Sequence, residues 1–232
     1  MNIRGIDKTS LIDYPGKICA VLFCGGCNLR CGFCHNPEIV LNSTSLDLIS
    51  NDEILEFLKK RKNLIDGVTL SGGEPTLSKS IISFTKKIHN LSLMIKLDTN
   101  GLNPSVLSEL SRNKLIDYVA IDIKTSPSKY NRLADKKVDF ALIQDSIGVL
   151  QKAGIDFELR TTCIPGFAEM DDFWEIKKYI KTVNKYFLQQ FISKIPLIDE
   201  SYRSLQPYTV NYLLQLKEFV SSFAEICEVR GI

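Results

Sequence analysis

The sequence has no excess of charge of either sign and no long hydrophobic run. Its 29 lysines and arginines against 27 aspartates and glutamates leave a net charge of +2, which gives no basis for a nucleic-acid-binding surface. The longest apolar run near the start, Ile18 to Phe23, is far too short to span a membrane, and Met1 to Ser10 is polar and mixed. We therefore expect no nucleic-acid partner, no membrane segment, no signal peptide and a cytoplasmic location.

Internal repeats, low-complexity segments and Pro/Gly-rich linkers are also absent. The 232 residues are 44% hydrophobic and 24% charged, which is ordinary for a globular protein with a real core. This length suits one large domain or two small ones, and α/β barrels of this size are commonly single domains. With no linker in the sequence, residues 1–232 are expected to form a single domain.

Cysteine, by contrast, is concentrated in one short segment. Four of the seven cysteines lie between Cys24 and Cys34, in a chain in which we find no export signal. A disulfide framework belongs to small secreted proteins in an oxidising compartment. Binding of a metal or a cluster in a reducing compartment is the better interpretation of this spacing.

Short β-rich runs alternate with helix-like segments along the whole chain. Strands are expected at Lys17–Phe23, Gly67–Leu70, Met94–Asp98, Tyr118–Ile123, Ile155–Thr161, Phe187–Ile192 and Ile226–Val229. Helices are expected at Asp52–Lys60, Lys79–His89, Pro104–Leu110, Asp139–Lys152, Asp171–Lys181 and Val210–Phe223. Six consecutive βα units predict a parallel sheet with right-handed crossovers. Periodicity alone leaves open whether that sheet is flat, a partial barrel or closed.

The polar and glycine-rich motifs follow the ends of these strands. In parallel sheets the chemistry gathers at the carboxyl ends of the strands. There the sequence has the cysteine segment, Ser71 to Pro75, Asp98 to Gly101, Asp122 to Lys124, and Arg160 to Thr162. Five such motifs at one end of one sheet predict a single functional site.

The cysteine segment has the spacing C-x3-C-x2-C at Cys27, Cys31 and Cys34. An iron–sulfur cube normally takes four cysteine ligands, so three would leave one iron open to bind a substrate. A tetrathiolate zinc site that included Cys24 is disfavoured, because such sites use two separated C-x2-C pairs. Two alternatives stay open: Cys24 is either a fourth cluster ligand or a small apolar strand residue, and His35 is either a ligand or a loop-packing residue.

The cysteine spacing after a first strand resembles the radical S-adenosylmethionine (SAM) superfamily. The wider sequence resembles the activating proteins of anaerobic ribonucleoside-triphosphate reductase, relatives of the pyruvate formate-lyase activating enzymes. The resemblance covers most of the chain; its strongest motifs are Lys8 to Lys17, Gly26 to Cys31, Phe33 to Glu38, Gly72 to Pro75, Asp98 to Gly101 and Asp122 to Lys124, with a weaker one at Arg160 to Thr162. Cys24 departs from the family's pattern.

The resemblance implies a partial (β/α)6 TIM-like barrel of the radical SAM type, with a 4Fe–4S cluster and SAM as cofactors. Gly72 and Gly73 would let the backbone approach SAM closely, with Glu74 shaping the loop. Asp98, Asp122 and Lys124 would contact its amino acid or ribose end, and Arg160 could pair with its carboxylate. The two aspartates could also bind a small monovalent cation, or form a purely structural network with Lys124.

The implied activity is that of a radical SAM oxidoreductase. A flavodoxin or ferredoxin would reduce the cluster, SAM would be cleaved to methionine and a 5′-deoxyadenosyl radical, and that radical would take a hydrogen atom from a glycine Cα of a partner glycyl radical enzyme. The motif from Ser10 to Lys17 favours the anaerobic ribonucleotide reductase as that partner over pyruvate formate-lyase.

Two rival functions remain. A radical SAM enzyme of small molecules often carries a second cluster, but only Cys163 and Cys227 lie beyond residue 34. An electron carrier or zinc module would not need six βα units with polar strand ends.

Overall fold

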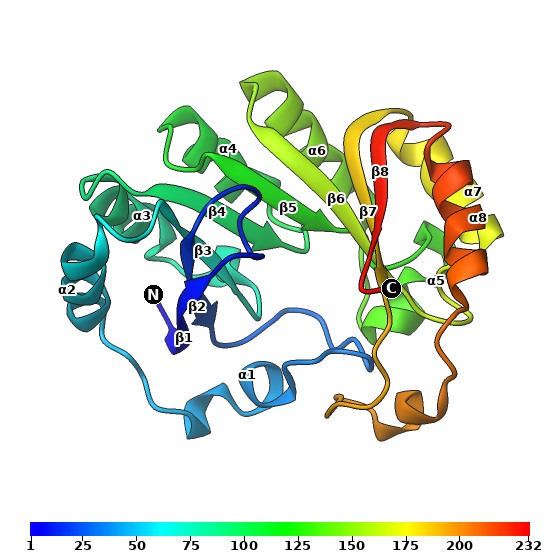
Figure 1. Cartoon of the computed structure of the whole chain (residues 1–232), viewed down its shortest axis with the longest axis horizontal. Helices are drawn as coiled ribbons and strands as arrows, with labels where there is room; N and C mark the ends of the chain where they lie inside the picture. Colours follow the sequence, from blue (N-terminus) through cyan, green and yellow to red (C-terminus); the bar gives the residue numbers. More distant parts are fainter.

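The computed structural model describes residues 1–232 and contains one eight-stranded sheet, whose strands follow each other in chain order (Figure 1). Strands β2 to β8 are parallel to their neighbours, and β1 is antiparallel to β2. The strands are β1 Ile3–Ser10, β2 Cys19–Cys24, β3 Gly67–Gly72, β4 Met94–Thr99, β5 Tyr118–Asp122, β6 Asp156–Cys163, β7 Val183–Gln190 and β8 Ala224–Arg230. Strands β1 and β8 form the two edges, so the sheet is an open, partial barrel, which confirms the expected (β/α)6 architecture.

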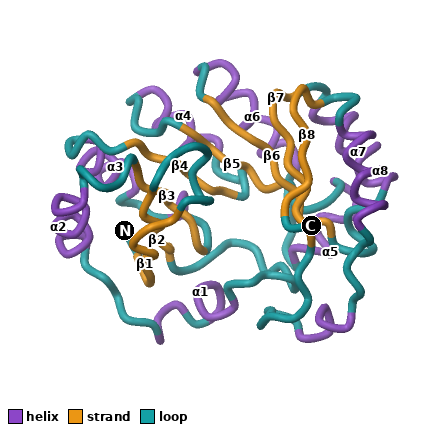
Figure 2. The backbone as a smooth tube through the Cα atoms, viewed as in Figure 1, coloured by secondary structure: helices purple, strands orange, loops and turns teal.

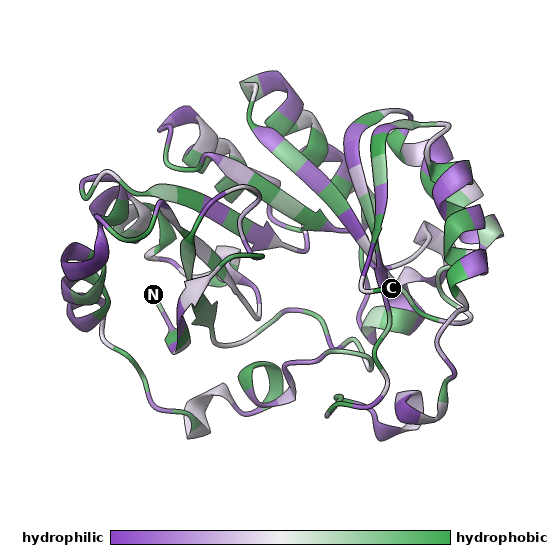
Figure 3. Ribbon diagram, in the orientation of Figure 1, coloured by the Kyte–Doolittle hydropathy of each residue, from purple (hydrophilic) through white to green (hydrophobic).

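Most of the helices lie around the outer face of the curved sheet, while the short helix Pro37–Leu41 lies apart from it, in the connection after β2 (Figures 1 and 2). The helices are α1 Pro37–Leu41, α2 Asn51–Arg61, α3 Ile81–His89, α4 Pro104–Arg112, α5 Pro127–Ala134, α6 Phe140–Ala153, α7 Met170–Ile180 and α8 Val210–Val220. Figure 3 shows hydrophobic and hydrophilic residues alternating along these helices, as expected where one face packs on a sheet. None of them combines the length and the hydropathy that a membrane crossing requires.

Local sequence explains where several helices begin and end. Helix α2 begins after Ser50, whose hydroxyl accepts a hydrogen bond from Glu53 N, while the Glu53 carboxylate accepts one from Ser50 N. Helix α6 ends at Gly154, whose φ of +67° favours glycine. The buried apolar side chains form one main cluster of 51 residues, so the sheet and its helices share a common core.

Three elements were not expected from the sequence: β1, α1 and α5. Strand β1 lies at an edge and most of its residues are at least partly exposed, so its sequence lacks an apolar signal. Helices α1 and α5 have only 5 and 8 residues, too few to show a clear helical period. Asn103 stands directly before α4, but its side chain donates to Thr76 O instead of capping the helix.

Candidate functional site

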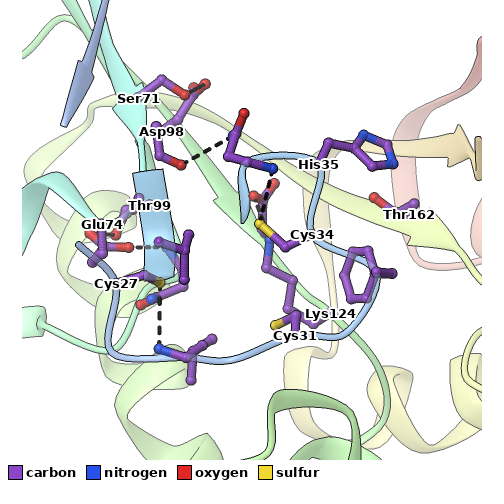
Figure 4. Close-up of a pocket in the computed structure, with 18 of the residues that line it drawn as sticks. Cys27, Cys31, Cys34, His35, Ser71, Glu74, Asp98, Thr99, Lys124 and Thr162 are labelled. Atoms are coloured by element: carbon purple, nitrogen blue, oxygen red, sulfur yellow. Dashed lines mark hydrogen bonds and ion pairs between the residues drawn. The ribbon is translucent and has the colours of Figure 1, made fainter. Parts of the chain in front are cut away.

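All ten residues that the sequence analysis assigned to cofactors line one cavity of about 210 Å³ at the carboxyl ends of β2 to β6 (Figure 4). We call it the cofactor cavity. Its wall contains the expected cysteines and SAM contacts: Cys27, Cys31, Cys34, Gly72, Gly73, Glu74, Asp98, Asp122, Lys124 and Arg160. Residues distant in sequence meet there because parallel strands place their carboxyl ends at the same edge of the sheet.

The three cysteines lie on the loop after β2, and none of the chain's cysteines is in a disulfide. Leu29 N donates to Cys27 Sγ at 3.4 Å, and Asn36 N donates to Cys34 Sγ at 3.5 Å. Burial raises the pKa of Cys31 to about 12. The three thiols line one cavity, but their sulfur atoms do not lie close enough together to bind a single metal ion. Three soft sulfur donors, two of them with N–H···S contacts, have the donor chemistry of an iron–sulfur cluster.

Cys24 differs from the three cavity cysteines in its position. It ends β2, is 2% exposed and packs in the main core, and it does not line the cofactor cavity. Burial raises the pKa of its thiol to about 12. Of the two alternatives left open by the sequence, the structure favours the apolar strand residue.

The glycines of the loop after β3 allow that loop to touch the cysteine loop. A Cβ on Gly73 would lie 2.0 Å from Gly26 O, and Gly72 has a φ of +102°. Gly73 N donates to Cys24 O and Glu74 N donates to Gly26 O, each at 2.8 Å. The close approach expected at these glycines is that of a ligand, and the close approach in the structure is that of a neighbouring backbone.

Glu74 connects this loop to the end of β4. Its carboxylate is buried and accepts hydrogen bonds from the N–H and hydroxyl of Thr76, the hydroxyl of Thr99 and the N–H of Asn100. Burial raises the pKa of Glu74, and these donors oppose that rise. Asn100 in turn donates to Asn28 of the cysteine loop at 2.7 Å. The donors of Thr99 and Asn100 thus hold the loop after β3 against the end of β4, and Asn100 also holds the cysteine loop there.

A network of ion pairs forms the inner wall of the cavity. Asp122 accepts from Arg160 Nε and from Lys124 Nζ, each at 2.8 Å, and Arg160 lies 3.5 Å from Asp98, which also pairs with Lys96. Burial alone would raise the pKa of both aspartates, but Arg160 and the lysines outweigh it and hold each pKa below its usual range. Side chains of the protein already balance the charge of the two aspartates. The monovalent cation expected between them stays a prediction.

Lys96 is the main residue that the sequence analysis missed. It is 2% exposed, points to the same face of β4 as Asp98 and neutralises that carboxylate. Side chains two residues apart on a strand point to the same face, so the position of Lys96, two residues before Asp98, could have predicted this pairing. Ser71, whose hydroxyl donates to Asp98, and Asn36, whose amide donates to Gly72 O, also line the cavity; both lie in motifs found in the sequence, which assigned them no individual role.

A second, larger cavity of about 720 Å³ adjoins the first and shares His35, Arg160 and Thr162 with it. We call it the side cavity. Its other lining residues come from the β1–β2 loop, the strand interiors and the ends of β7 and β8: Ile12, Asp13, Pro15, Lys96, Glu158, Gln189, Gln190, Ile192, Arg230 and Gly231. Glu158 is buried there, accepting from Tyr118 at 2.9 Å and from both terminal nitrogens of Arg230 at 3.0 and 3.1 Å.

Comparison with known proteins connects this geometry to a family. Residues 21–180 match the model of the radical SAM superfamily. A Methanocaldococcus jannaschii protein, whose name assigns it provisionally to the glycyl-radical enzyme activating enzymes, is 34% identical over 99% of this chain and 96% of its own. The pyruvate formate-lyase-activating enzyme of Clostridium pasteurianum is 29% identical over 79% of each chain.

Solved structures show the same fold. SuiB of Streptococcus suis, solved with S-adenosylmethionine bound, has a TM-score of 0.66 and 16% identity over 89% of this chain. The match covers 48% of SuiB, so this chain spans about half of that protein's length. From the family match, the activating-enzyme relatives and the shared fold, we conclude that this chain is an enzyme of the radical SAM superfamily, whose members use a 4Fe–4S cluster and SAM.

Proposed function

We propose that this enzyme activates a glycyl radical enzyme, and that its target is the anaerobic ribonucleoside-triphosphate reductase. The observation that carries the proposal is the pair of adjoining cavities: the first collects all ten expected cofactor residues, and the second leads away from them between the β1–β2 loop and the edge strand β8. The relatives named as activating enzymes support the same class of activity. Residues 1–232 would act as one radical SAM domain in a reducing cytoplasm.

Cys27, Cys31 and Cys34 would hold the cluster and leave one iron open for SAM. When bound and reduced, this pair of cofactors supplies a 5′-deoxyadenosyl radical that can take a hydrogen atom from a glycine Cα. The hydrogen bonds from Leu29 N and Asn36 N to two of the sulfurs would help to set the potential of the cluster.

The ion-pair network would orient SAM. Lys124 and Arg160 each have donors beyond those given to Asp122, so they can meet the carboxylate of the cofactor's methionine part. Asp98 and Asp122 are held ionised and can accept from its amino or hydroxyl groups. Gly72, Gly73 and Glu74 would shape the loop beside it, since the Glu74 carboxylate is fully occupied by donors from the protein.

The side cavity suits an uncharged peptide segment better than a phosphorylated metabolite. Its cations are already paired: Lys96 with Asp98, Arg160 with Asp122, and Arg230 with Glu158. The remaining polar groups are the Asp13 carboxylate, the His35 ring, the amides of Gln189 and Gln190 and the hydroxyl of Thr162. The neutral donors and acceptors match a peptide backbone, and the Asp13 carboxylate disfavours a phosphate.

The rim of the side cavity carries the motif that favours the reductase. Leu11 and Ile12, within the segment Lys8 to Lys17, are 71% and 89% exposed on the β1–β2 loop. Large exposed apolar side chains at the mouth of a cavity are typical of a protein docking site. A pyruvate formate-lyase is the second candidate target, because a relative with that specificity matches 79% of this chain.

The test is anaerobic incubation of the reconstituted enzyme with a chemical reductant, SAM and either candidate partner. Electron paramagnetic resonance should detect a glycyl radical in the reductase, and deuterium from a reductase labelled at glycine should appear in 5′-deoxyadenosine. A glycyl radical formed only in pyruvate formate-lyase would reassign the target. Turnover with a small metabolite and no transfer of label from either protein would overturn the activase assignment.

A further inference from the structure

The outer side of the cysteine loop lies against the end of helix α5. Arg30 N donates to Ala134 O at 2.8 Å, and the Arg30 guanidinium donates to Cys27 O at 2.6 Å and to Leu29 O at 2.8 Å. Figure 1 shows the loop after β2 reaching the neighbourhood of α5. The carboxyl end of α5 is thus one hydrogen bond from the segment that carries the cysteines.

An aromatic column lies beside the same loop. Tyr202 packs on Gly32, where a Cβ would lie 2.6 Å from the tyrosine ring, and Asp199 N donates to Gly32 O at 2.9 Å. Phe167 stacks on Tyr202 with ring centroids 6.3 Å apart and planes inclined by 22°, and the Arg132 guanidinium lies 4.7 Å from the Phe167 centroid. The column leads from Gly32, between two of the cysteines, to an exposed arginine.

The surface beside this column carries cations that no carboxylate of the chain pairs with. Arg132, Lys136 and Lys137 are exposed and Arg30 is half-buried, and none of the four takes part in an ion pair. The nearby acids are Asp135, Asp139 and Asp199, while Glu200 is paired with Arg203. None of the four cations lines the cofactor cavity or the side cavity. We define Arg30, Arg132, Lys136 and Lys137 as the α5 face.

We propose that the α5 face is the docking site of an acidic one-electron donor protein. The inference rests on the proposed cluster site and adds where its electron enters. In the step, the reduced donor loses one electron and the cluster gains it, with no proton or bond transferred. Cations that no carboxylate neutralises, around a partly apolar centre, complement an acidic protein, and they accelerate its association by electrostatic steering. A donor bound there would leave both cavities open to SAM and to the glycine-bearing partner.

The test compares two matched double variants. Lys136→Glu with Lys137→Glu reverses two charges on the α5 face, and Lys86→Glu with Lys87→Glu reverses two exposed charges at the end of α3. Each reconstituted protein is mixed anaerobically with a reduced acidic flavodoxin, and the rate of cluster reduction is followed by absorbance at several salt concentrations. Dithionite replaces the flavodoxin in a parallel arm, and affinity for oxidised flavodoxin is measured by titration.

We expect the α5-face variant to be reduced about tenfold more slowly by flavodoxin and to bind it more weakly, with iron content and dithionite reduction unchanged. The α3 variant should behave as the wild type, and added salt should slow the wild type toward the α5-face variant. Equal flavodoxin rates and affinities in all three proteins would overturn the docking site while leaving the cluster assignment intact. A wild-type protein that takes up no iron would instead contradict the proposed cluster site, and the docking site with it.

Discussion

The cofactor cavity and the side cavity share a wall but are built in different ways. Backbone contacts shape the cofactor cavity, where two loops touch at Gly26 and Gly73 and Glu74 is fully occupied by donors. Long side chains, such as Arg230 and Gln190, line the larger side cavity, and exposed apolar residues stand at its rim. The backbone contacts make the first cavity pre-organised for a fixed ligand, while the second is the cavity that we propose to receive a segment of the partner protein.

The largest effect is expected at the three cysteines. Cys27→Ala, Cys31→Ala and Cys34→Ala should each abolish the 4Fe–4S cluster or all SAM cleavage, because each removes a proposed ligand. Cys24→Ala should keep about four irons per chain, since its thiol packs in the core. Iron analysis and SAM cleavage after anaerobic reconstitution provide the measurement. Loss of cleavage in the Cys24 variant together with full activity in the Cys34 variant would reverse our ligand assignment.

The next effect concerns the backbone contact of the cofactor cavity. Gly73→Ala would place a Cβ 2.0 Å from Gly26 O, so one of the two loops has to move. We expect SAM binding to fall by at least about tenfold, and the free energy of unfolding to fall by about 2 kcal/mol. Gly148→Ala is the matched control, because it lies within α6 and its Cβ would meet nothing within 4 Å.

The Gly148 control should gain about 0.5–1 kcal/mol, as alanine replaces glycine within a helix. Calorimetry and SAM titration measure both variants. A Gly73→Ala protein that binds SAM as tightly as the wild type would show that the loop contact does not shape the cavity.

A smaller loss of affinity is expected within the ion-pair network. Asp98→Ala and Lys124→Ala should each weaken SAM binding by about 10- to 100-fold without removing the cluster, because each deletes one charged contact. Isothermal titration with SAM, beside iron analysis, gives the comparison. Unchanged affinity in both variants would favour a purely structural network of aspartates and lysines.

At the side cavity a rim substitution should act on the partner alone. Ile12→Ser removes a side chain that is 89% exposed, so stability and SAM binding should be unchanged. The KM for the reductase should rise about three- to tenfold, since an apolar contact is lost only in the complex. Leu64→Ser, also exposed but just beyond α2, is the control and should leave that KM unaltered. An Ile12 variant with the wild-type KM would remove this rim from the docking surface.

The smallest effect is a change in the pH dependence of stability. Arg160 and Lys124 hold the pKa of Asp122 below its usual range against the opposing effect of burial. A depressed acid pKa stabilises the folded state above the unfolded pKa of about 4, and that contribution is lost as the pH falls through the folded value. As the pH drops below ~4, the free energy of unfolding of the Asp122→Asn variant should therefore fall by about 1 kcal/mol less than that of the wild type. The exposed Asp47→Asn variant should keep the wild-type pH dependence. Equal slopes of unfolding free energy against pH in the two variants would show that the ion pairs contribute no net stability.

Most of the sheet and the contents of the cofactor cavity could be predicted from local sequence patterns. Apolar runs located β2 to β8, and the motifs after them had to meet because parallel strands share an edge at their carboxyl ends. The spacing of Cys27, Cys31 and Cys34 is a local property, so it could be interpreted without neighbours in space. The same reasoning placed Asp98, Asp122, Lys124 and Arg160 in one site, where the structure finds them.

The contacts that these residues make could not be predicted from the sequence. Lys96 became part of the site through its pairing with Asp98, and Gly73 through the backbone of a loop 47 residues earlier (Gly26), relations that no local pattern contains. Strand β1 is polar because it lies at an edge, and the side cavity exists because β1 and β8 do not close the barrel. The physical reason is the same throughout: sequence periodicity reports the burial of each residue, whereas contacts between distant loops depend on how the whole sheet curves.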